Sequence, residues 1–459
     1  MELIYLSARE LAQQIRDKKV SAVEAVKACL ARIAEVNPKL NAVVQLTAER
    51  ALAEAREADG LIAKGQPNGP LGGVPMTIKD SFDTAGVVST GGTLGRKDFI
   101  PAQDATVVAR LRAAGAILLG KTNTPEFTLG SSGRGTVNLV YGATENPYKL
   151  GYHPFGSSGG AAAIIASGGA FFDIGTDYGG SIRGPAHACG IAGLKPTQGR
   201  VPRTGHIVDY GGAFDSVQQV GPMARRVEDL TLILPIIAGP DYADAAIAPM
   251  PVGDPAKVDV KALRAAWYTS NGEVEPTAEI RQTVEKCAGL MSAAGAKVTP
   301  ATPPRIKEAA EIREKLQGAD GRAHIRRLLT KSRTTQASPG LRLDGEVLTP
   351  SQFTELVEKL DEWRSQMLAF LENYDLILCP VSAYPARPLE AEAIPPGGNY
   401  TRIYNTTGWP GAVVRAGTSP EGLPIGIQIV GRPWAEDVVL AAAAYIESKT
   451  GGWQKPQGI

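Results

Sequence analysis

Gly156-Ser157-Ser158-Gly159-Gly160 and Gly179-Gly180-Ser181 are two glycine-rich stretches that flank one apolar segment. The segment between them is typical of a helix, Ala161–Ala166, followed by a strand, Ala170–Ile174. A helix of this kind runs out by roughly 15 Å, and the strand returns about as far at about 3.3 Å per residue. We therefore expect the two serine-bearing stretches at the same edge of a sheet. A nucleophile with a second hydroxyl beside it would suit hydrolysis.

The composition narrows the class of protein. The chain has 459 residues, a formal net charge of +1 and 43% hydrophobic residues, which fits one large α/β unit or two to three domains. No basic cluster is interleaved with aromatic residues, which argues against nucleic acid as a partner. The sequence shows no signal peptide and no apolar run long enough to cross a membrane. We therefore expect a cytoplasmic protein.

Cysteine and histidine positions argue against a metal site. The four cysteines are far apart and form no Cys-x-x-Cys pair, so we expect reduced thiols at Cys29, Cys189, Cys287 and Cys379. The four histidines have no ligand spacing with another histidine or cysteine; they are His153, His187, His206 and His324. We expect neither a metal nor a cofactor.

Helices and strands are expected to alternate along most of the chain. The pairs Ser7/Glu10 and Ser21/Glu24 fit capping boxes, and Asn37-Pro38 is expected to end the second helix. Asp104 is expected to cap a helix that runs to Ala114. Strands are expected at Val74–Ile78, Ala116–Leu119, Leu376–Cys379, Ala412–Val414 and Ile425–Val430, and a final helix at Ala435–Glu447. This alternation predicts helices that cover a parallel or mixed sheet.

We interpret the chain as a single domain, 1–459. It divides into N-terminal helices (1–65), a catalytic core (70–238), a variable insertion or cover (239–345) and the rest of the same sheet (346–459). The third segment is rich in proline and in charged helices. It is expected to roof a pocket, with Leu316, Ile325 and Leu328 as candidate contacts.

Three residues are candidates for catalysis. Ser181 is the best nucleophile, because the N–H groups from Tyr178 through Gly179 and Gly180 to Ser181 could form an oxyanion hole. The alternative is an ordinary turn. Ser157 could relay a proton, or instead cap the helix that begins near Gly159. Lys79 could be the base, because burial lowers the pKa of an amine. The alternative is a surface lysine at the end of a strand.

Two further patterns match known sites but lack their context. Gly115–Thr122 fits a phosphate-binding loop, but its four middle residues are typical of a strand and no helix follows. Gly156–Gly160 also fits a nucleophile elbow with Ser158 as the nucleophile. That chemistry needs an acid and then a histidine downstream, and His324 lies in a charged segment. This is the weaker of the two enzyme interpretations.

Taken together, the sequence resembles the amidase signature family of serine hydrolases over nearly its whole length. The matching stretches include Gly73–Asp80, Gly120–Phe127, Ser157–Gly160, Gly175–Arg183, Gly193–Thr197, Leu423–Gln428 and Gly431–Pro433. The resemblance implies one large mixed sheet with helices on both faces, and a Ser-Ser-Lys triad. Ser181 would attack the carbonyl, and Ser157, which follows a cis peptide bond in this family, would pass the proton to neutral Lys79. Asp177 and Arg183 would support the loop.

Several positions depart from the usual family pattern and bear on the substrate. Phe155 and Tyr178 add aromatic surface, and Gly184 leaves space, which favours small apolar or aromatic amides, anilides or carbamates (urethanes). By family analogy, Ser131 and Ser132 belong to the substrate wall.

The alternative is a glutamine amidotransferase-type subunit of a tRNA-amidating complex. In such members an aspartate precedes the segment that corresponds to Asn405–Gly411, and the matching position here lies at or near Gly398. Without that carboxylate, recognition of a free α-amino group is disfavoured. We therefore expect a small-molecule amide or carbamate and water as partners, no nucleic acid and no membrane, and leave a homodimer open. A binding protein without catalysis remains a third interpretation.

Overall fold

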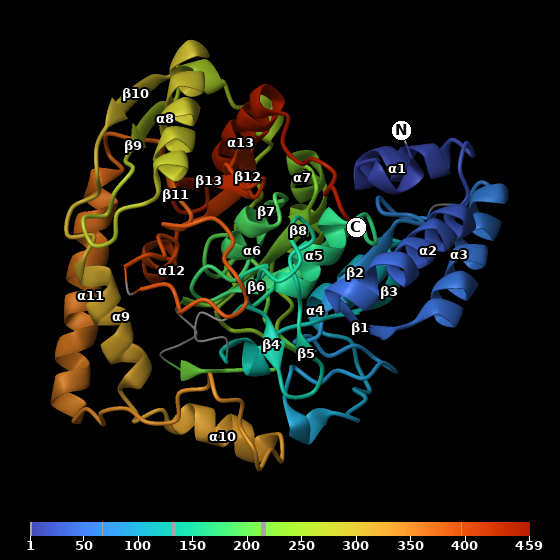
Figure 1. Ribbon diagram of the computed structural model, residues 1–459, viewed down its shortest axis with the longest axis horizontal. Coiled ribbons are helices and arrows are strands. Elements are labelled where there is room, and N and C mark those ends of the chain that lie inside the picture. Colours follow the sequence, from blue (N-terminus) through green and yellow to red (C-terminus); the bar gives the residue numbers. More distant parts are fainter. Residues whose placement is uncertain (1, 67, 131–134, 213–216, 396) are drawn as a thin grey trace.

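The computed structural model describes residues 2–66, 68–130, 135–212, 217–395 and 397–459. Its centre is an eleven-stranded mixed sheet (Figure 1), which confirms the expected fold class. The strand order is β1 (Val43–Leu46), β3 (Ile117–Thr122), β2 (Pro75–Lys79), β6 (Phe172–Asp177), β8 (Gln219–Ala224), β7 (Ala192–Lys195), β12 (Gly411–Thr418), β13 (Pro424–Gly431), β11 (Leu376–Pro380), β9 (Arg264–Trp267) and β10 (Lys297–Pro300). A short hairpin, β4 (Val137–Asn138) and β5 (Gly142–Ala143), forms a separate sheet.

Helices cover both faces of this sheet. Side chains of β12 alternate between two apolar clusters. Val413 packs with α5 (Gly159–Ala166) and α6 (Arg183–Ala188), whereas Ala412 and Val414 pack with α7 (Val227–Ile237) and α13 (Glu436–Thr450). The helices are α1 (Ala8–Arg16), α2 (Ala22–Leu40), α3 (Ala48–Ala63), α4 (Thr106–Ala113), α5 (Gly159–Ala166), α6 (Arg183–Ala188), α7 (Val227–Ile237), α8 (Ala278–Ala293), α9 (Glu308–Gly318), α10 (Ala323–Lys331), α11 (Pro350–Phe370), α12 (Arg402–Thr406) and α13 (Glu436–Thr450). Within the described ranges, every helix is too short or too polar to span a bilayer.

Two predicted helix boundaries are wrong. Helix α2 continues through Pro38 to Leu40 and ends where Asn41 adopts a left-handed conformation. Pro38 is tolerated because it lies in the last turn, and the Asn37 side chain accepts hydrogen bonds from the N–H groups of Ala42 and Val43, both at 2.8 Å. Asp104 does not cap α4; its carboxylate accepts from the N–H of Ala85 at 2.7 Å.

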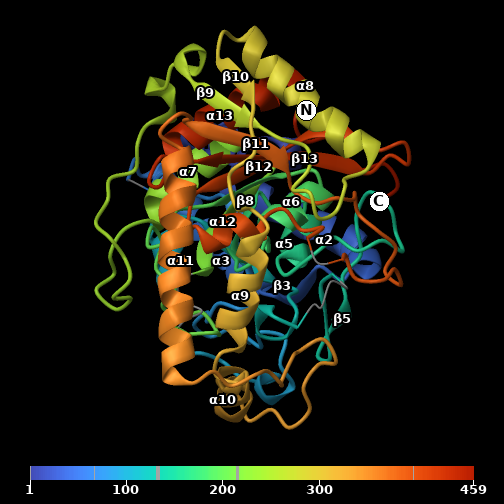
Figure 2. The ribbon, with the colours of Figure 1, turned by 90° about the vertical axis from the view of Figure 1, so that its left-hand side faces the viewer.

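The segment 239–345 contributes to the sheet as well as to its cover. Sequence analysis predicts no strand there, yet β9 and β10 pair in parallel and extend the sheet beyond β11. Both strands are short and partly exposed, so they lack the apolar run that marks the central strands. Helix α9 packs against α11, and α10 lies at one end of the molecule (Figures 1 and 2).

The stretch that matches a phosphate-binding loop is a strand. Residues 117–122 form β3, and all six are buried. The Lys121 ammonium is therefore inside the protein, where it donates to the hydroxyls of Thr84 and Ser89, both at 2.9 Å. No phosphate cradle forms in this stretch.

Candidate active site

Lys79 lies at the end of β2 and is completely buried. Its Nζ contacts three hydroxyls: Ser157 Oγ at 2.7 Å, Thr176 Oγ1 at 2.8 Å and Ser158 Oγ at 3.0 Å. Strand β2 is parallel to its neighbours β3 and β6, so the carboxyl ends of all three strands lie at one edge of the sheet. The structure thus brings Lys79 and Ser157 together and excludes a surface lysine.

Burial makes Lys79 an unusual lysine. Desolvation lowers the pKa of its amine to about 7, against the opposing attraction of Asp173 and Asp177. An appreciable fraction of the amine is therefore neutral near neutral pH, with a lone pair that can accept a proton.

Asp173, on β6, accepts hydrogen bonds from the same end of β2. One carboxylate oxygen accepts from the backbone N–H of Lys79 at 2.9 Å, and the other accepts from the hydroxyls of Thr77 at 2.7 Å and Thr122 at 3.0 Å. All of these side chains are buried. Burial raises the pKa of Asp173 to about 6, although the three hydrogen bonds oppose this.

The two serine-bearing stretches are adjacent, as predicted. The backbone N–H of Ser158 donates to the carbonyl of Ser181 at 3.1 Å, and the peptide bond between Gly156 and Ser157 is cis. Ser158, not Ser157, is the N-cap residue of α5, and its side chain makes no capping bond. The alternative role of Ser157 as a helix cap is therefore not realised.

Ser158 lacks the surroundings of a histidine-dependent nucleophile. Its hydroxyl contacts the amine of Lys79. His324 lies on α10, where its Nδ1 is 3.8 Å from a carboxylate oxygen of Asp320. The basic neighbour of Ser158 is thus a lysine, which weakens the elbow interpretation.

The loop from Tyr178 to Ser181 is anchored by a buried ion pair. Arg183 donates to both carboxylate oxygens of Asp177 at 2.9 Å, and both side chains are fully buried. Burial alone would raise the pKa of Asp177, but the Arg183 guanidinium holds it well below its usual range. The N–H of Gly180 also donates to Asp177, at 2.7 Å. Gly180 is therefore a poor oxyanion donor in this arrangement, and the other three N–H groups remain a prediction.

Groups from distant parts of the chain fix the carbonyls of this loop. The carbonyl of Gly179 accepts from Asn399 Nδ2 at 2.9 Å and from Thr401 Oγ1 at 3.0 Å. Arg313, on α9, donates to the carbonyl of Tyr178 and stacks on its ring at 4.6 Å. The orientation of the two peptide groups is thus set by side chains from α9 and from the segment before α12.

A cavity of about 420 Å³ opens beside Ser181. Phe155 and Gly184 line it, as the sequence predicts, whereas Ser131 and Ser132 lie outside the described residues. Of the three candidate cover contacts, Ile325 lines the cavity. The other two, Leu316 and Leu328, pack in apolar clusters.

The described lining of this cavity is rich in arginine. It holds four arginines and one glutamate: Arg313, Arg322, Arg342, Arg402 and Glu314. Glu314 pairs with Arg322 at 2.7 Å and with Arg342 at 2.8 Å. Within the described residues, Nη1 of Arg313 and Nε of Arg322 are buried without a hydrogen-bond partner. The cavity therefore favours a ligand that carries negative charge.

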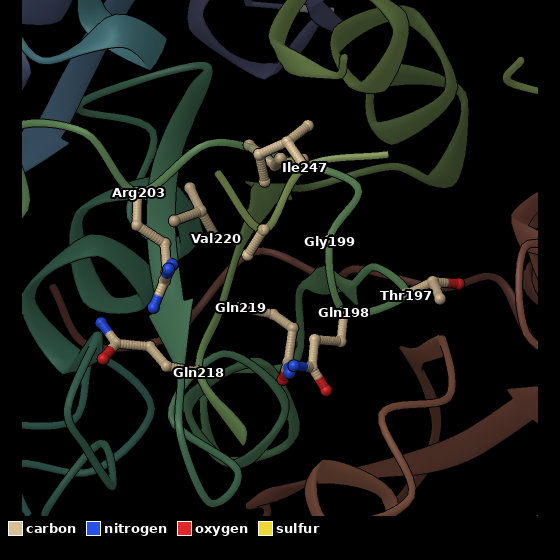
Figure 3. A pocket seen from close by; sticks show the side chains of 10 residues that line it. Thr197, Gln198, Gly199, Arg203, Gln218, Gln219, Val220 and Ile247 are labelled. Carbon is tan, nitrogen blue, oxygen red and sulfur yellow. The ribbon is translucent and has the colours of Figure 1, made fainter. Parts of the chain in front are cut away.

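A second cavity, of about 10 Å³, lies between Gln198, Gln218 and Gln219 (Figure 3). This volume suits one water molecule. The side chain of Gln219 approaches Asn405, which in turn contacts Asp177 at 2.8 Å. This cavity is thus too small for a substrate.

Sequence reasoning missed three groups of the site. Thr176 directly precedes Asp177 and could have been found there. Asp173 lies four residues before Asp177 on β6, so the sequence already implied that both side chains share one face of this strand. Arg313 comes from the cover and carried no local signal. Among the described residues, no cluster of histidine, cysteine or carboxylate side chains could hold a metal.

Comparisons with known proteins find relatives that match most or all of the chain. The amidase family model matches residues 24–440. A glutamyl-tRNA(Gln) amidotransferase subunit from Moorella thermoacetica is 37% identical over 98% of each chain. Among solved structures, 6-aminohexanoate cyclic dimer hydrolase superposes with a TM-score of 0.88 at 27% identity, covering 100% and 99% of the two chains. The peptide amidase of Stenotrophomonas maltophilia superposes with a TM-score of 0.84 at 29% identity, covering 99% and 98%.

The relative from Moorella corrects one prediction. Its name contains a transfer RNA and describes the protein as one subunit of an enzyme. The prediction of a small-molecule amide or carbamate and water as partners, with no nucleic acid, is therefore wrong. The prediction rested on the absence of a basic aromatic surface, but one component of an enzyme can serve a transfer RNA without carrying the surface that binds it.

Proposed function

Because the chain belongs to the amidase signature family, we propose that it cleaves amide bonds through an acyl-enzyme on Ser181, with Ser157 as the proton relay and Lys79 as the base. The observation that carries this proposal is the 2.7 Å contact between the buried Lys79 amine and the Ser157 hydroxyl. A lysine can replace histidine as the base of a serine hydrolase when its amine is neutral.

The first half of the reaction forms the acyl-enzyme. Ser181 Oγ attacks the carbonyl carbon while its proton passes to Ser157 Oγ, and the proton of Ser157 passes to Lys79 Nζ. The backbone N–H groups of Tyr178, Gly179 and Ser181 stabilise the negative oxygen. The intermediate collapses when the carbon–nitrogen bond breaks and the leaving nitrogen takes the proton back through Ser157.

The second half releases the acyl group. Water takes the place of the leaving amine and gives its proton to Lys79 through Ser157. The new tetrahedral intermediate expels Ser181, whose oxygen is protonated again by the same route. The three side chains thus return to their starting state.

The relatives favour glutamine as the substrate, within an enzyme that amidates a charged transfer RNA. This is the alternative of the sequence analysis, and the 37% identity over 98% of each chain supports it better than a stand-alone hydrolase of apolar amides. The arginines of the cavity support it too, because four arginines against one glutamate in the lining suit the α-carboxylate of glutamine.

A second candidate is the hydrolysis of small apolar or aromatic amides, anilides or carbamates. Phe155, Ile325 and Ile394 line the cavity and favour an apolar group. The position at Gly398 carries no carboxylate, and the neighbouring Asn399 amide is engaged with Gly179. A free α-amino group therefore lacks its expected partner there.

The experiment measures product release from glutamine, a chromogenic anilide and a matched aryl carbamate. Ser181→Ala, Ser157→Ala and Lys79→Ala are each expected to lower hydrolysis on the order of a thousandfold or more. Ser351→Ala, at the exposed start of α11, is the control. Glutamine binding to Ser181→Ala, measured by calorimetry, separates the two substrates even if the chain needs partner subunits for turnover. Full activity in Ser181→Ala would refute the proposal.

A further inference from the structure

Asp173 is a buried carboxylate that the mechanism above does not use. It lies on β6, the strand beside β2, and accepts three hydrogen bonds, from the Lys79 N–H and from the hydroxyls of Thr77 and Thr122. Its side chain is fully buried. Three donors around one carboxylate favour its ionised form, while burial opposes ionisation. Because burial makes an ionised carboxylate unfavourable, we looked for a function of Asp173 beyond packing.

The charged groups around Lys79 come from several elements. Asp173 and Asp177 on β6 attract its ammonium form. Asp177 is already paired with Arg183, and Asp80, the residue after Lys79, lies 3.9 Å from the ammonium of Lys121.

Two other titratable groups also act in this region. His206 interacts with Lys79, but burial holds the pKa of His206 far below its usual range, so the imidazole is neutral. Lys121 interacts with Asp173 from β3 without forming an ion pair with it. Within the described residues, Asp173 is therefore the carboxylate that acts on Lys79 without a cationic side chain of its own.

We propose that Asp173 is a positioning residue that sets the protonation equilibrium of Lys79. Its hydrogen bonds fix the end of β2, and its negative charge stabilises the ammonium form of the base. This inference rests on the proposed role of Lys79. Burial alone would make the amine neutral but too weak a base to take the proton of Ser157, and the nearby charge restores its basicity.

The test uses a fluorophosphonate, which labels an activated serine and needs no knowledge of the substrate. The rate of labelling of Ser181 is measured against pH in the wild type and in Asp173→Asn. The wild-type rate is expected to rise with pH through about 7, as Lys79 loses its proton. In Asp173→Asn the ammonium form loses its stabilisation, so this rise is expected roughly one pH unit lower, with a lower plateau.

Asp229→Asn is the matched control. Asp229 is also buried, at the start of α7, and burial raises its pKa to about 7. It accepts from the N–H of Arg9, away from the serines. This variant is expected to keep the wild-type profile. A purely structural role of Asp173 would lower the rate at every pH and leave the position of the rise unchanged, which would overturn the proposal.

Thr122→Val keeps the experiment decisive if Asp173→Asn fails to fold. It removes one donor from the carboxylate, which raises the pKa of Asp173 and reduces its ionised fraction. The rise is then expected to move in the same direction by a smaller amount, and an unmoved rise would refute the proposal. Equal labelling of Ser181→Ala and the wild type would instead refute the proposed function, and the role of Asp173 with it.

Discussion

Lys79 has three hydroxyl neighbours and, when neutral, two N–H groups and one lone pair. Two hydroxyls must therefore accept from the amine, and the third donates to it. Ser158 Oγ also lies 3.5 Å from the carbonyl of Thr176, to which it can donate while it accepts from Lys79. With Ser158 and Thr176 as acceptors, the lone pair faces Ser157. Thr176 and Ser158 thus orient the amine of Lys79.

This arrangement predicts the effect of Thr176→Val, which removes one acceptor but keeps the shape of the side chain. The rate of Ser181 labelling should fall about tenfold, because one hydrogen bond that orients the base is lost. Thr47→Val, which removes a hydrogen bond to the carbonyl of Leu118 away from the site, is the control. An unchanged rate in Thr176→Val would mean that Thr176 does not orient the amine.

Lys79 should also make stability depend on pH. Burial lowers its pKa in the folded protein to about 7, from 10.5. Between these values the unfolded chain binds more protons, so the free energy of unfolding rises with pH across this window. Lys79→Met should therefore raise the melting temperature most at pH 7 and least near pH 10. Lys64→Met, at an exposed position, should change neither value, and a lower melting temperature of Lys79→Met at pH 7 would contradict this.

At the residue scale, the sequence singled out the three candidate residues of the proposed triad but not the groups that surround Lys79. Lys79, Ser157 and Ser181 each lie in a local pattern that reports their chemistry. Asp173 had no such pattern, because its role comes from β2 and β3, which lie beside it only in the folded sheet. The engagement of the Gly180 N–H by Asp177 likewise depends on the path of the loop, which composition does not report.

At the scale of elements, α6 begins without a side-chain cap of its own. The carboxylate of Asp177 takes that place, since it accepts from the N–H groups of Ile182 at 3.2 Å and Arg183 at 3.3 Å. One side chain at the end of β6 therefore starts the next helix, anchors the loop between them and neutralises a buried arginine.

Removal of this charge should be costly. Asp177→Asn leaves Arg183 buried without its counter-ion, and we expect a loss of about 3–5 kcal/mol in the free energy of unfolding. Ser181 labelling should be lost as well, because the loop is no longer anchored. Denaturant unfolding measures the first effect. Asp375→Asn, which breaks a partly exposed pair with Arg264, should cost about 1 kcal/mol or less. Equal losses in the two variants would contradict this account.

Elements were predicted best where the sequence was most apolar. The central strands β2, β3, β6 and β13 are buried along their whole length, and their apolar runs were recognised. Strand β10, at the edge of the sheet, and its neighbour β9 were missed because both are short and carry mixed side chains. Pro38 misled because a proline in the last turn removes a single i→i−4 hydrogen bond, the one to the carbonyl of Ala34, and the helix continues for only two residues beyond it.

At the scale of the whole molecule, the site is closed by α9, which belongs to the segment interpreted as a cover. Arg313 contacts the loop of Ser181 from this side, and burial lowers its pKa to about 10. Its charge is thus held beside the loop that carries Ser181 at an electrostatic cost, and a bound carboxylate would offset that cost.

Arg313→Gln should therefore weaken the binding of carboxylates. In a Ser181→Ala background, the Kd for glutamine should rise about tenfold or more, since a charge-assisted hydrogen bond is lost. The Kd for butyramide, which lacks the carboxylate, should stay unchanged. Arg327→Gln, on the exposed side of α10, is the control. Equal weakening of both ligands would show that Arg313 only supports the loop.

The hydrogen-bond partners of Arg183 determine when the site can form during synthesis on the ribosome. Its guanidinium donates to Gln428, 245 residues further along the chain, and to Asn405. At the usual pace of translation, roughly 10–50 s pass between the synthesis of Arg183 and that of Gln428. A nascent chain thus carries both serines long before it can assemble them. Hydrolytic activity should begin only when the last strands have emerged.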